Sequence, residues 1–200
     1  GVSMTSFLAP VMAQTSRPKT ALVLGVGSAR GFAHIGVIKA IEAAGIKPDL
    51  IVGASAGSVI GVFYAAGYTG QQMEDIAMKV RDADVIDQSN NSKRGLIAGA
   101  ALQKLINTFV KDKPIESLKI PFVAIATNLK NGEAVQLRTG DTGQAVRASS
   151  SMPGIFLPTS INGAELVDGA ISSPLPVAVA RQMGAEVVIA VDVGSAPQNP

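Results

Sequence analysis

The sequence predicts an α/β fold in which helices pack against a mostly parallel central sheet. Short, continuous apolar runs recur along the chain, and such runs are typical of strands buried on both faces of a parallel sheet. Segments of helical periodicity separate these runs. Strands and helices that alternate in this way form a layered sheet joined by right-handed crossovers.

The first two strands and helices are well delimited. A buried strand is expected over 20–25 and a helix over 32–44, where isoleucines line one side and Gly45 provides a C-terminal stop. Residues 50–53 form the second expected strand. The helix expected over 56–66 is apolar on nearly every side, which predicts that it lies at the centre of the fold.

Two amphipathic segments follow, the first around Met73, Ile76 and Val80 and the second over 102–109. A polar linker, 87–94, is expected between them. The remaining expected elements are strands over 121–127, 134–137, 165–167 and 186–193, and helices over 144–150 and 176–183.

Composition excludes several classes of protein. The chain of 200 residues suits a single domain, and its 17 basic and 15 acidic residues include no basic run that would indicate a nucleic-acid surface. The absence of cysteine excludes disulfides, thiolate metal sites and a cysteine nucleophile, and a single histidine excludes a histidine-rich metal site. No apolar stretch approaches the roughly 18 residues of a transmembrane segment.

Both ends of the chain are expected to lie outside the core of the domain. Residues 1–18 are interpreted as a leader or an artificial extension, and the domain as 19–200 with a C-terminus that looks truncated. Residues 7–14 resemble the end of a secretory signal, with Val11 and Ala13 at small-residue cleavage positions. No basic segment precedes them, so both interpretations of this segment stay open.

Ser55 is the candidate nucleophile. The sequence Gly53-Ala54-Ser55-Ala56-Gly57 matches G-x-S-x-G, with an apolar strand directly before it and a buried helix directly after it. A sharp turn there would raise the hydroxyl above the sheet, and the helix N-terminus would offer positive potential to an oxyanion. The alternative is a glycine-rich turn whose serine only caps the helix.

A serine hydroxyl needs a neighbouring base before it becomes a good nucleophile. His34 precedes the serine inside an apolar helix, so we expect a packed residue bonded to backbone rather than a triad member. A carboxylate can accept the proton directly at hydrogen-bond distance. Asp168 closes a short strand, which predicts that its carboxylate lies at the same sheet edge as Ser55. The alternative is a turn aspartate before glycine.

A glycine-rich loop, 25–31, links the first strand to the first helix. Backbone N–H groups at such a position bind anions, and two anions compete as explanations: a bound phosphate and the transient oxyanion of acyl transfer. A dinucleotide site requires G-x-G-x-x-G and an acidic residue after the second strand. The loop reads G-x-G-x-x-x-G and no such acid follows, which disfavours a dinucleotide.

The glycine loop, the G-x-S-x-G turn and the downstream D-G-A sequence occur in this order. Their arrangement resembles the patatin-like phospholipase family, particularly its bacterial members, from Lys19 to Gly194. Further matching segments are GFAHIGV at 31–37, RGL at 94–96 and SSSMPG at 149–154, with Phe156 and Pro158.

The resemblance implies a three-layer α/β/α patatin-like fold with a mostly parallel central sheet, and a Ser–Asp dyad without histidine. Ser55 is then the nucleophile and Asp168 its base. Backbone around four consecutive residues of the loop would form the oxyanion hole: Gly27, Ser28, Ala29 and Arg30. The small residues that support the motifs are Gly25, Gly31, Gly53, Gly57, Gly169 and Ala170.

One departure from the family pattern concerns the glycine loop, in which Val26 and Ser28 interrupt the usual glycine run. A β-branched valine resists positive φ. Either these two positions therefore have ordinary dihedrals, or the oxyanion hole is altered.

The leading hypothesis is an esterase of phospholipids, lysophospholipids or related fatty-acyl esters that works through an acyl-enzyme and needs no metal or organic cofactor. The expected partners are the lipid substrate and a peripheral membrane surface. Most residues of the amphipathic stretches within 71–110 are expected to pack on the sheet, and the alternative is that they line an acyl groove or rest on that surface. The bacterial cytoplasm and the periplasm both stay open as its location. The alternative is a regulatory or lipid-binding module with weak or lost catalysis.

Overall fold

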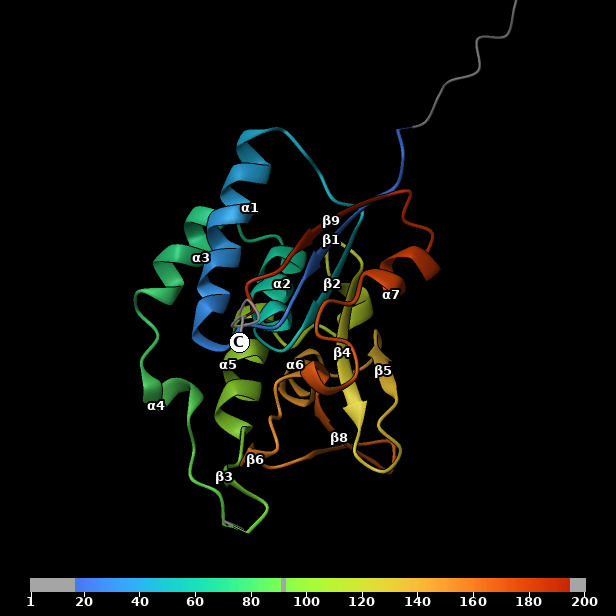
Figure 1. Cartoon of the computed structure of the whole chain (residues 1–200). Coiled ribbons are helices and arrows are strands. Elements are labelled where there is room, and N and C mark those ends of the chain that lie inside the picture. Colours follow the sequence, from blue (N-terminus) through green and yellow to red (C-terminus); the bar gives the residue numbers. More distant parts are fainter. Residues whose placement is uncertain (1–16, 91–92, 195–200) are drawn as a thin grey trace, which may run out of the picture.

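The computed structural model describes residues 17–90 and 93–194, which form a mixed sheet of seven strands with helices around it (Figure 1). Six strands follow the order β7-β8-β4-β2-β1-β9, and β5 pairs with β4 beside this path. Their bounds are β1 Thr20–Leu24, β2 Leu50–Ala54, β4 Phe122–Asn128, β5 Ala134–Leu137, β7 Thr159–Ile161, β8 Ala164–Asp168 and β9 Val187–Val191.

The strands β9, β1, β2 and β4 are mutually parallel, whereas β5, β7 and β8 are added in antiparallel pairings. Every residue of β1 and β2 is buried, as their continuous apolar sequences predict. The expected α/β fold with a mostly parallel central sheet is therefore confirmed.

Seven α-helices are described, and they cover the sheet unequally. Figure 1 shows α1, α2 and α3 on one side of β1 and β2 and α7 on the other. The bounds are α1 Ala33–Ala43, α2 Ala56–Ala66, α3 Gly70–Ala77, α4 Asp82–Val85, α5 Ala100–Val110, α6 Thr142–Ser149 and α7 Val177–Gln182.

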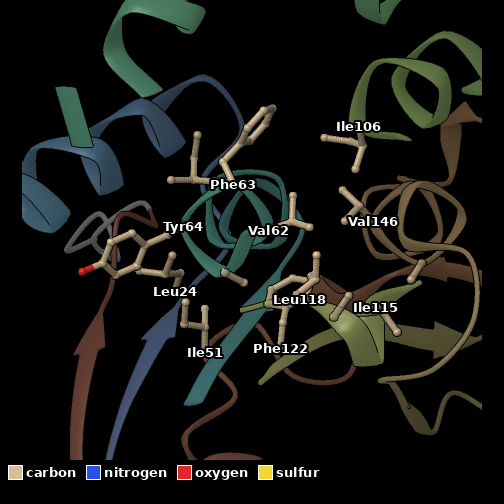
Figure 2. Packing of buried hydrophobic residues seen from close by; sticks show 14 of the residues in the cluster. Leu24, Ile51, Val62, Phe63, Tyr64, Ile106, Ile115, Leu118, Phe122 and Val146 are labelled. Carbon is tan, nitrogen blue, oxygen red and sulfur yellow. The ribbon is translucent and has the colours of Figure 1, made fainter. Parts of the chain in front are cut away.

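The core follows from the alternation of side chains along the strands. Leu22 and Leu24 point to the larger cluster around α2, while Ala21 and Val23 point to the smaller cluster that includes Val179 of α7. Figure 2 shows Val62 and Phe63 of α2 inside the larger cluster, with residues of the sheet, α5 and α6 around them. The helix expected at the centre of the fold is indeed nearly all buried.

Several boundaries differ from the expected ones. The helix expected to start at residue 32 begins at Ala33, after a 3-10 turn, Ser28–Phe32. A two-stranded parallel sheet of β3 Gly95–Ile97 and β6 Gly154–Phe156 was not expected. Three-residue strands carry too little periodicity to be found from sequence.

The expected polar linker has defined structure where it is described. The carboxylate of Asp87 accepts hydrogen bonds from the amides of Gly99 and Ala100 at the start of α5, at 2.7 and 3.0 Å. The amide of Ser89 donates to the carbonyl of Leu96. At the N-terminus, residues 1–16, including the signal-like segment, lie outside the described residues, and Arg17 pairs with Asp49 at 2.6 Å.

Candidate active site

Ser55 occupies a sharp turn between β2 and α2. Its backbone has φ 52° and ψ −122°, a conformation that a non-glycine residue adopts only under strain, and α2 begins at the next residue. The residue is 8% exposed. This strand–turn–helix geometry is the structural context that a G-x-S-x-G nucleophile requires.

The glycines on either side of the turn are required by close approach of backbone. A β-carbon on Gly53 would lie 2.6 Å from the carbonyl oxygen of Gly57 and from the α-carbon of Ser58. A β-carbon on Gly57 would collide with the carbonyl group of Leu24 in the neighbouring strand. The two glycines therefore let α2 start directly against β1 and β2.

Replacing Gly57 by alanine is expected to lower the free energy of unfolding by about 3 kcal/mol, the upper end of ordinary overpacking costs, because the obstacle is strand backbone rather than a movable side chain. Urea denaturation measures this change. Gly36 in α1 provides the control, since a β-carbon there meets no heavy atom within 4 Å. Gly36→Ala is expected to stabilise the protein by about 0.5–1 kcal/mol. Equal stability of the two variants would contradict this account.

Asp168 is the last residue of β8 and is 1% exposed. Its Oδ2 accepts a hydrogen bond from Ser55 Oγ at 2.7 Å, and its Oδ1 accepts one from the amide of Ala170 at 2.8 Å. A β-carbon on Gly169 would collide with the carbonyl oxygen of Ile125, so glycine lets the turn after β8 lie against β4. The D-G-A sequence thus both places and orients the carboxylate.

The route by which Asp168 reaches Ser55 differs from the expected one. Asp168 lies opposite Ala126 of β4 in an antiparallel pairing, whereas Ala54 lies opposite Ile125 in a parallel one. The strands β2 and β8 therefore run in opposite directions on the two sides of β4, and their last residues, Ala54 and Asp168, pair with neighbouring residues of β4. Their meeting follows from the length of β4, which extends past the end of β2, and not from a shared strand direction.

Burial raises the pKa of the Asp168 carboxyl above its ordinary value. This effect outweighs the hydrogen bonds from the Ala170 amide and the Ser55 hydroxyl, which lower the pKa. A carboxylate of raised pKa is a stronger base than one in water, so the site favours proton transfer to Asp168.

The glycine loop lies at the N-terminus of α2. A β-carbon on Gly31 would come within 2.5 Å of the side chain of Ala56, which is the first residue of α2. Ser28 has φ 49°, while Val26 is not among the described residues with positive φ. The alternative in which both positions have ordinary dihedrals is therefore wrong for Ser28, whereas Val26 conforms to it. Ser28 pays little for this because it lacks the second Cβ branch of valine.

The amides of the loop divide into two groups. Those of Gly25 and Val26 donate to the carbonyls of Val191 and Pro174, at 3.0 Å each. Within the described residues, no backbone carbonyl accepts a hydrogen bond from the amides at positions 27–29. These three consecutive N–H groups are the candidates to bind an anion. Gly25 belongs to the anchoring part of the loop.

His34 and Arg30 stabilise the loop. His34 is fully buried, and its Nε2 donates to the carbonyl of Gly25 at 2.9 Å, as expected for a packed histidine. Burial lowers the pKa of His34, which outweighs the raising effect of that hydrogen bond. The Arg30 Nε donates to the carbonyl of Val193 at 2.9 Å. Neither side chain takes part in the direct hydrogen bond between Ser55 and Asp168.

Two buried hydroxyls at the site were not singled out from the sequence. Ser149 Oγ accepts from the amide of Ser55 at 3.0 Å, and Thr127 Oγ1 donates to the carbonyl of Asp168 at 2.8 Å. The only signal for Ser149 was its place in the matching segment 149–154, which gave it no role. In the part of the chain that the structure describes, no cluster of three metal-ligating side chains is present.

An apolar cavity of about 190 Å³ lies beside the site, between α2 and α3 with α5 at its end. Its walls include Val59, Met73 and Leu102, and Phe32. Val59 is one helical turn from Ser55, and Phe32 ends the 3-10 turn that includes the second half of the glycine loop. Met73 and Leu102 belong to the amphipathic stretches within 71–110, and both are also part of the larger core cluster.

Comparison with known proteins gives the same class as the fold and the site. The family model described as patatin-like phospholipase matches residues 22–181. The chain belongs to this family.

Its curated relatives are longer proteins. An uncharacterized NTE family protein of Mycobacterium bovis is 34% identical over 192 residues, which cover 93% of this chain and 52% of the relative. A lysophospholipase of Emericella nidulans is 35% identical over 199 residues, which cover 89% of this chain and 12% of the relative. The chain thus spans about half of the first and a small part of the second.

The fold also matches a solved structure. The crystal structure of VipD from Legionella pneumophila aligns with a TM-score of 0.52 over 80% of this chain and 47% of that one, at 14% sequence identity. At this identity the match concerns the fold alone.

Proposed function

We propose that the chain is a serine acyl hydrolase of fatty-acyl esters in which Ser55 is the nucleophile and Asp168 its base. The observation that carries the proposal is the 2.7 Å hydrogen bond between Ser55 Oγ and Asp168 Oδ2, which joins a hydroxyl on a strained turn to a buried carboxylate. Membership of the patatin-like phospholipase family supports the same reaction class.

The reaction begins when Ser55 Oγ attacks the ester carbonyl carbon and its proton passes to Asp168. The tetrahedral intermediate collapses, and the leaving alcohol takes the proton from Asp168 as the acyl-enzyme forms. Water then attacks the acyl-enzyme and gives its proton to Asp168. When this second intermediate collapses, that proton returns to Ser55 Oγ and the fatty acid is released.

The amides of Gly27, Ser28 and Ala29 are the proposed donors to the oxyanion in both intermediates. They lack a backbone acceptor within the described residues, and their loop reaches the N-terminus of α2 at Gly31, where the helix dipole favours negative charge. Arg30 contributes by fixing the loop to the carbonyl of Val193.

Two features support a lipid ester as substrate. The cavity next to Val59 is lined mostly by apolar side chains and suits an acyl chain. Phe32 and Ile171, which are 60% and 57% exposed, flank the site from the glycine loop and from the turn after β8. Exposed apolar side chains at a site entrance suit contact with a membrane surface. In the described part of the chain no helix is both long and apolar enough to cross a bilayer.

Filling the cavity is expected to change selectivity for chain length. Each methylene of the acyl chain that is buried in the cavity contributes about 0.8 kcal/mol to binding. If the phenylalanine of Val59→Phe excludes two such methylenes, kcat/KM for a decanoate ester falls roughly 15-fold. Hydrolysis of the acetate ester, whose acyl group is too short to fill the cavity, stays within about threefold. A series of p-nitrophenyl esters measures both values.

Val187→Phe is the matched control, because Val187 is 41% exposed at the start of β9 and lines no part of this cavity. The control is expected to keep the wild-type profile. An equal loss for acetate and decanoate in Val59→Phe would show that the substitution disturbs the dyad and that the cavity does not bind the acyl chain.

A further inference from the structure

The backbone amide of the candidate nucleophile is held by a side chain from a distant helix. Ser149, the last residue of α6, is fully buried, and its Oγ lies 3.0 Å from the Ser55 amide and 2.6 Å from the carbonyl oxygen of Ile125. An amide can only donate and a carbonyl can only accept. The hydroxyl therefore accepts from Ser55 and donates to Ile125, which fixes both of its hydrogen bonds.

These two backbone groups would be partners in an uninterrupted sheet. The amide of Ile51 donates to the carbonyl of Pro121 at 2.9 Å, in the register that pairs β2 with β4. In a parallel ladder this bond recurs at every second residue, which makes the Ser55 amide and the Ile125 carbonyl the partners two steps further along. The Ser149 hydroxyl is inserted between them at the point where the chain leaves the sheet for the strained turn.

The two sides of the Ser55 backbone are held unequally. Its carbonyl accepts from the Ser58 amide, the Val59 amide and the Ser58 hydroxyl, at 2.8, 3.2 and 2.7 Å. Its amide donates to Ser149. Loss of one donor leaves the carbonyl with partners, whereas loss of the Ser149 hydroxyl removes the acceptor that the buried Ser55 amide has in this structure.

We propose that Ser149 is a positioning residue of the acyl-transfer reaction. By holding the Ser55 amide away from the ladder, it sets the direction of the Cα–Cβ bond that aims Oγ at Asp168. It also occupies the Ser55 N–H, so this amide does not serve the oxyanion, which leaves that role to the glycine loop. The inference rests on the proposed reaction, and positional errors of about 1 Å at a reacting group cost on the order of 100-fold in rate.

The test compares Ser149→Ala with Ser151→Ala in the full chain. Ser151 is a matched control, because its hydroxyl is also fully buried and also forms two hydrogen bonds, to the Arg147 carbonyl and Thr159 Oγ1 at 2.8 and 3.0 Å. Among the described residues, the side chain of Ser151 forms no hydrogen bond to Ser55 or Asp168. The backbone carbonyl of Ser151 accepts from the Asp168 amide at 2.9 Å, and alanine keeps this bond. We measure kcat and KM for a p-nitrophenyl ester, the labelling rate of Ser55 by a fluorophosphonate, and thermal unfolding.

Ser149→Ala is expected to lower kcat and the labelling rate about 10–100-fold with KM within about twofold. Ser151→Ala is expected to lose comparable thermal stability and to keep kcat within about twofold. Equal kcat values for the two variants overturn the proposal. A wild-type protein whose Ser55 no fluorophosphonate labels overturns the proposed function and this inference with it, whereas rapid labelling of both wild type and Ser149→Ala overturns the positioning role alone.

If Ser149→Ala does not fold, Ser149→Thr and Ser149→Cys make the same comparison. Threonine keeps the hydroxyl, and cysteine fills its volume with a weak hydrogen-bonding group. A kcat that is retained in the threonine variant and lost in the cysteine variant supports the role of the hydroxyl. Retention of kcat in the cysteine variant overturns it.

Discussion

Ser55→Ala is expected to reduce ester hydrolysis by a factor of about 10⁴ or more, because the acyl-enzyme cannot form without the hydroxyl. The variant keeps both glycines of the turn and the hydrogen bond from its amide to Ser149, so it is expected to fold. Turnover of a p-nitrophenyl butyrate ester measures the loss of activity. Labelling by a fluorophosphonate, followed by intact-protein mass spectrometry, measures the loss of the nucleophile.

Ser160→Ala, at an exposed position of β7, is the control and is expected to react like the wild type. The experiment also decides between the two functions that the sequence left open. A non-catalytic regulatory or lipid-binding module predicts that wild-type Ser55 is inert although the protein is folded. Labelling of the wild type that persists in Ser55→Ala would place the nucleophile elsewhere.

Asp168→Asn is expected to lower kcat by about 10³–10⁴-fold, since an amide cannot accept the proton of Ser55. The change is nearly isosteric. The amide oxygen can still accept from Ala170, and the amide nitrogen can donate to Ser55 Oγ, so the geometry of the turn is kept. Fluorophosphonate labelling is expected to fall in parallel, because the serine loses its base while it keeps its position.

The same substitution is expected to stabilise the protein at neutral pH. The pKa of Asp168 is raised in the folded state, so its contribution to stability is full below the unfolded value of about 3.9 and is lost as the pH rises through the folded value. Removing the buried charge is expected to raise the unfolding free energy at pH 7–8 by about 0.5–2 kcal/mol, a common gain for one stabilising substitution. A destabilised Asp168→Asn would contradict the dominance of burial.

Asp49→Asn provides a control of opposite sign. A hydrogen bond from the Thr20 amide, with help from Arg17, lowers the pKa of Asp49, so its stabilising contribution is present above the unfolded pKa and disappears on acidification. Its neutralisation is expected to destabilise the protein at pH 7.

For the wild-type protein, the raised pKa of Asp168 predicts that kcat/KM falls on the acid side at a midpoint above about 3.9.

The sequence was most informative where function depends on local backbone. Buried strands gave continuous apolar runs at 20–25 and 50–53. The glycines around Ser55 form a short recognisable motif, although only Gly53 is required by backbone of the same region and Gly57 is required by the carbonyl of Leu24 in β1. In the D-G-A turn, the hydrogen bond from the Ala170 amide to the Asp168 carboxylate is local, whereas Gly169 is required by the carbonyl of Ile125 in β4. These features leave a signal in a few adjacent positions, and both members of the candidate dyad were found from it.

Features that depend on distant pairings were not predictable. The antiparallel direction of β8, the small sheet of β3 and β6 and the hydroxyl of Ser149 all depend on contacts between residues far apart in sequence. A serine in a run of three serines gives no local sign of which one is buried against a strand end. The positive φ of Ser28 was equally hidden, since the sequence could only show that Val26 resists such a conformation.

The order in which the two halves of the dyad are synthesised has a consequence for the cell. Ser55 and Asp168 are separated by 113 positions, and Asp168 lies on β8, which can pair with β4 only after all the segments between the two residues have been made. A nascent chain therefore carries its serine turn long before any base stands beside it. On the proposed function, ester hydrolysis is thereby deferred until β8 has been made, and fragments that end before β8 are expected to be inactive.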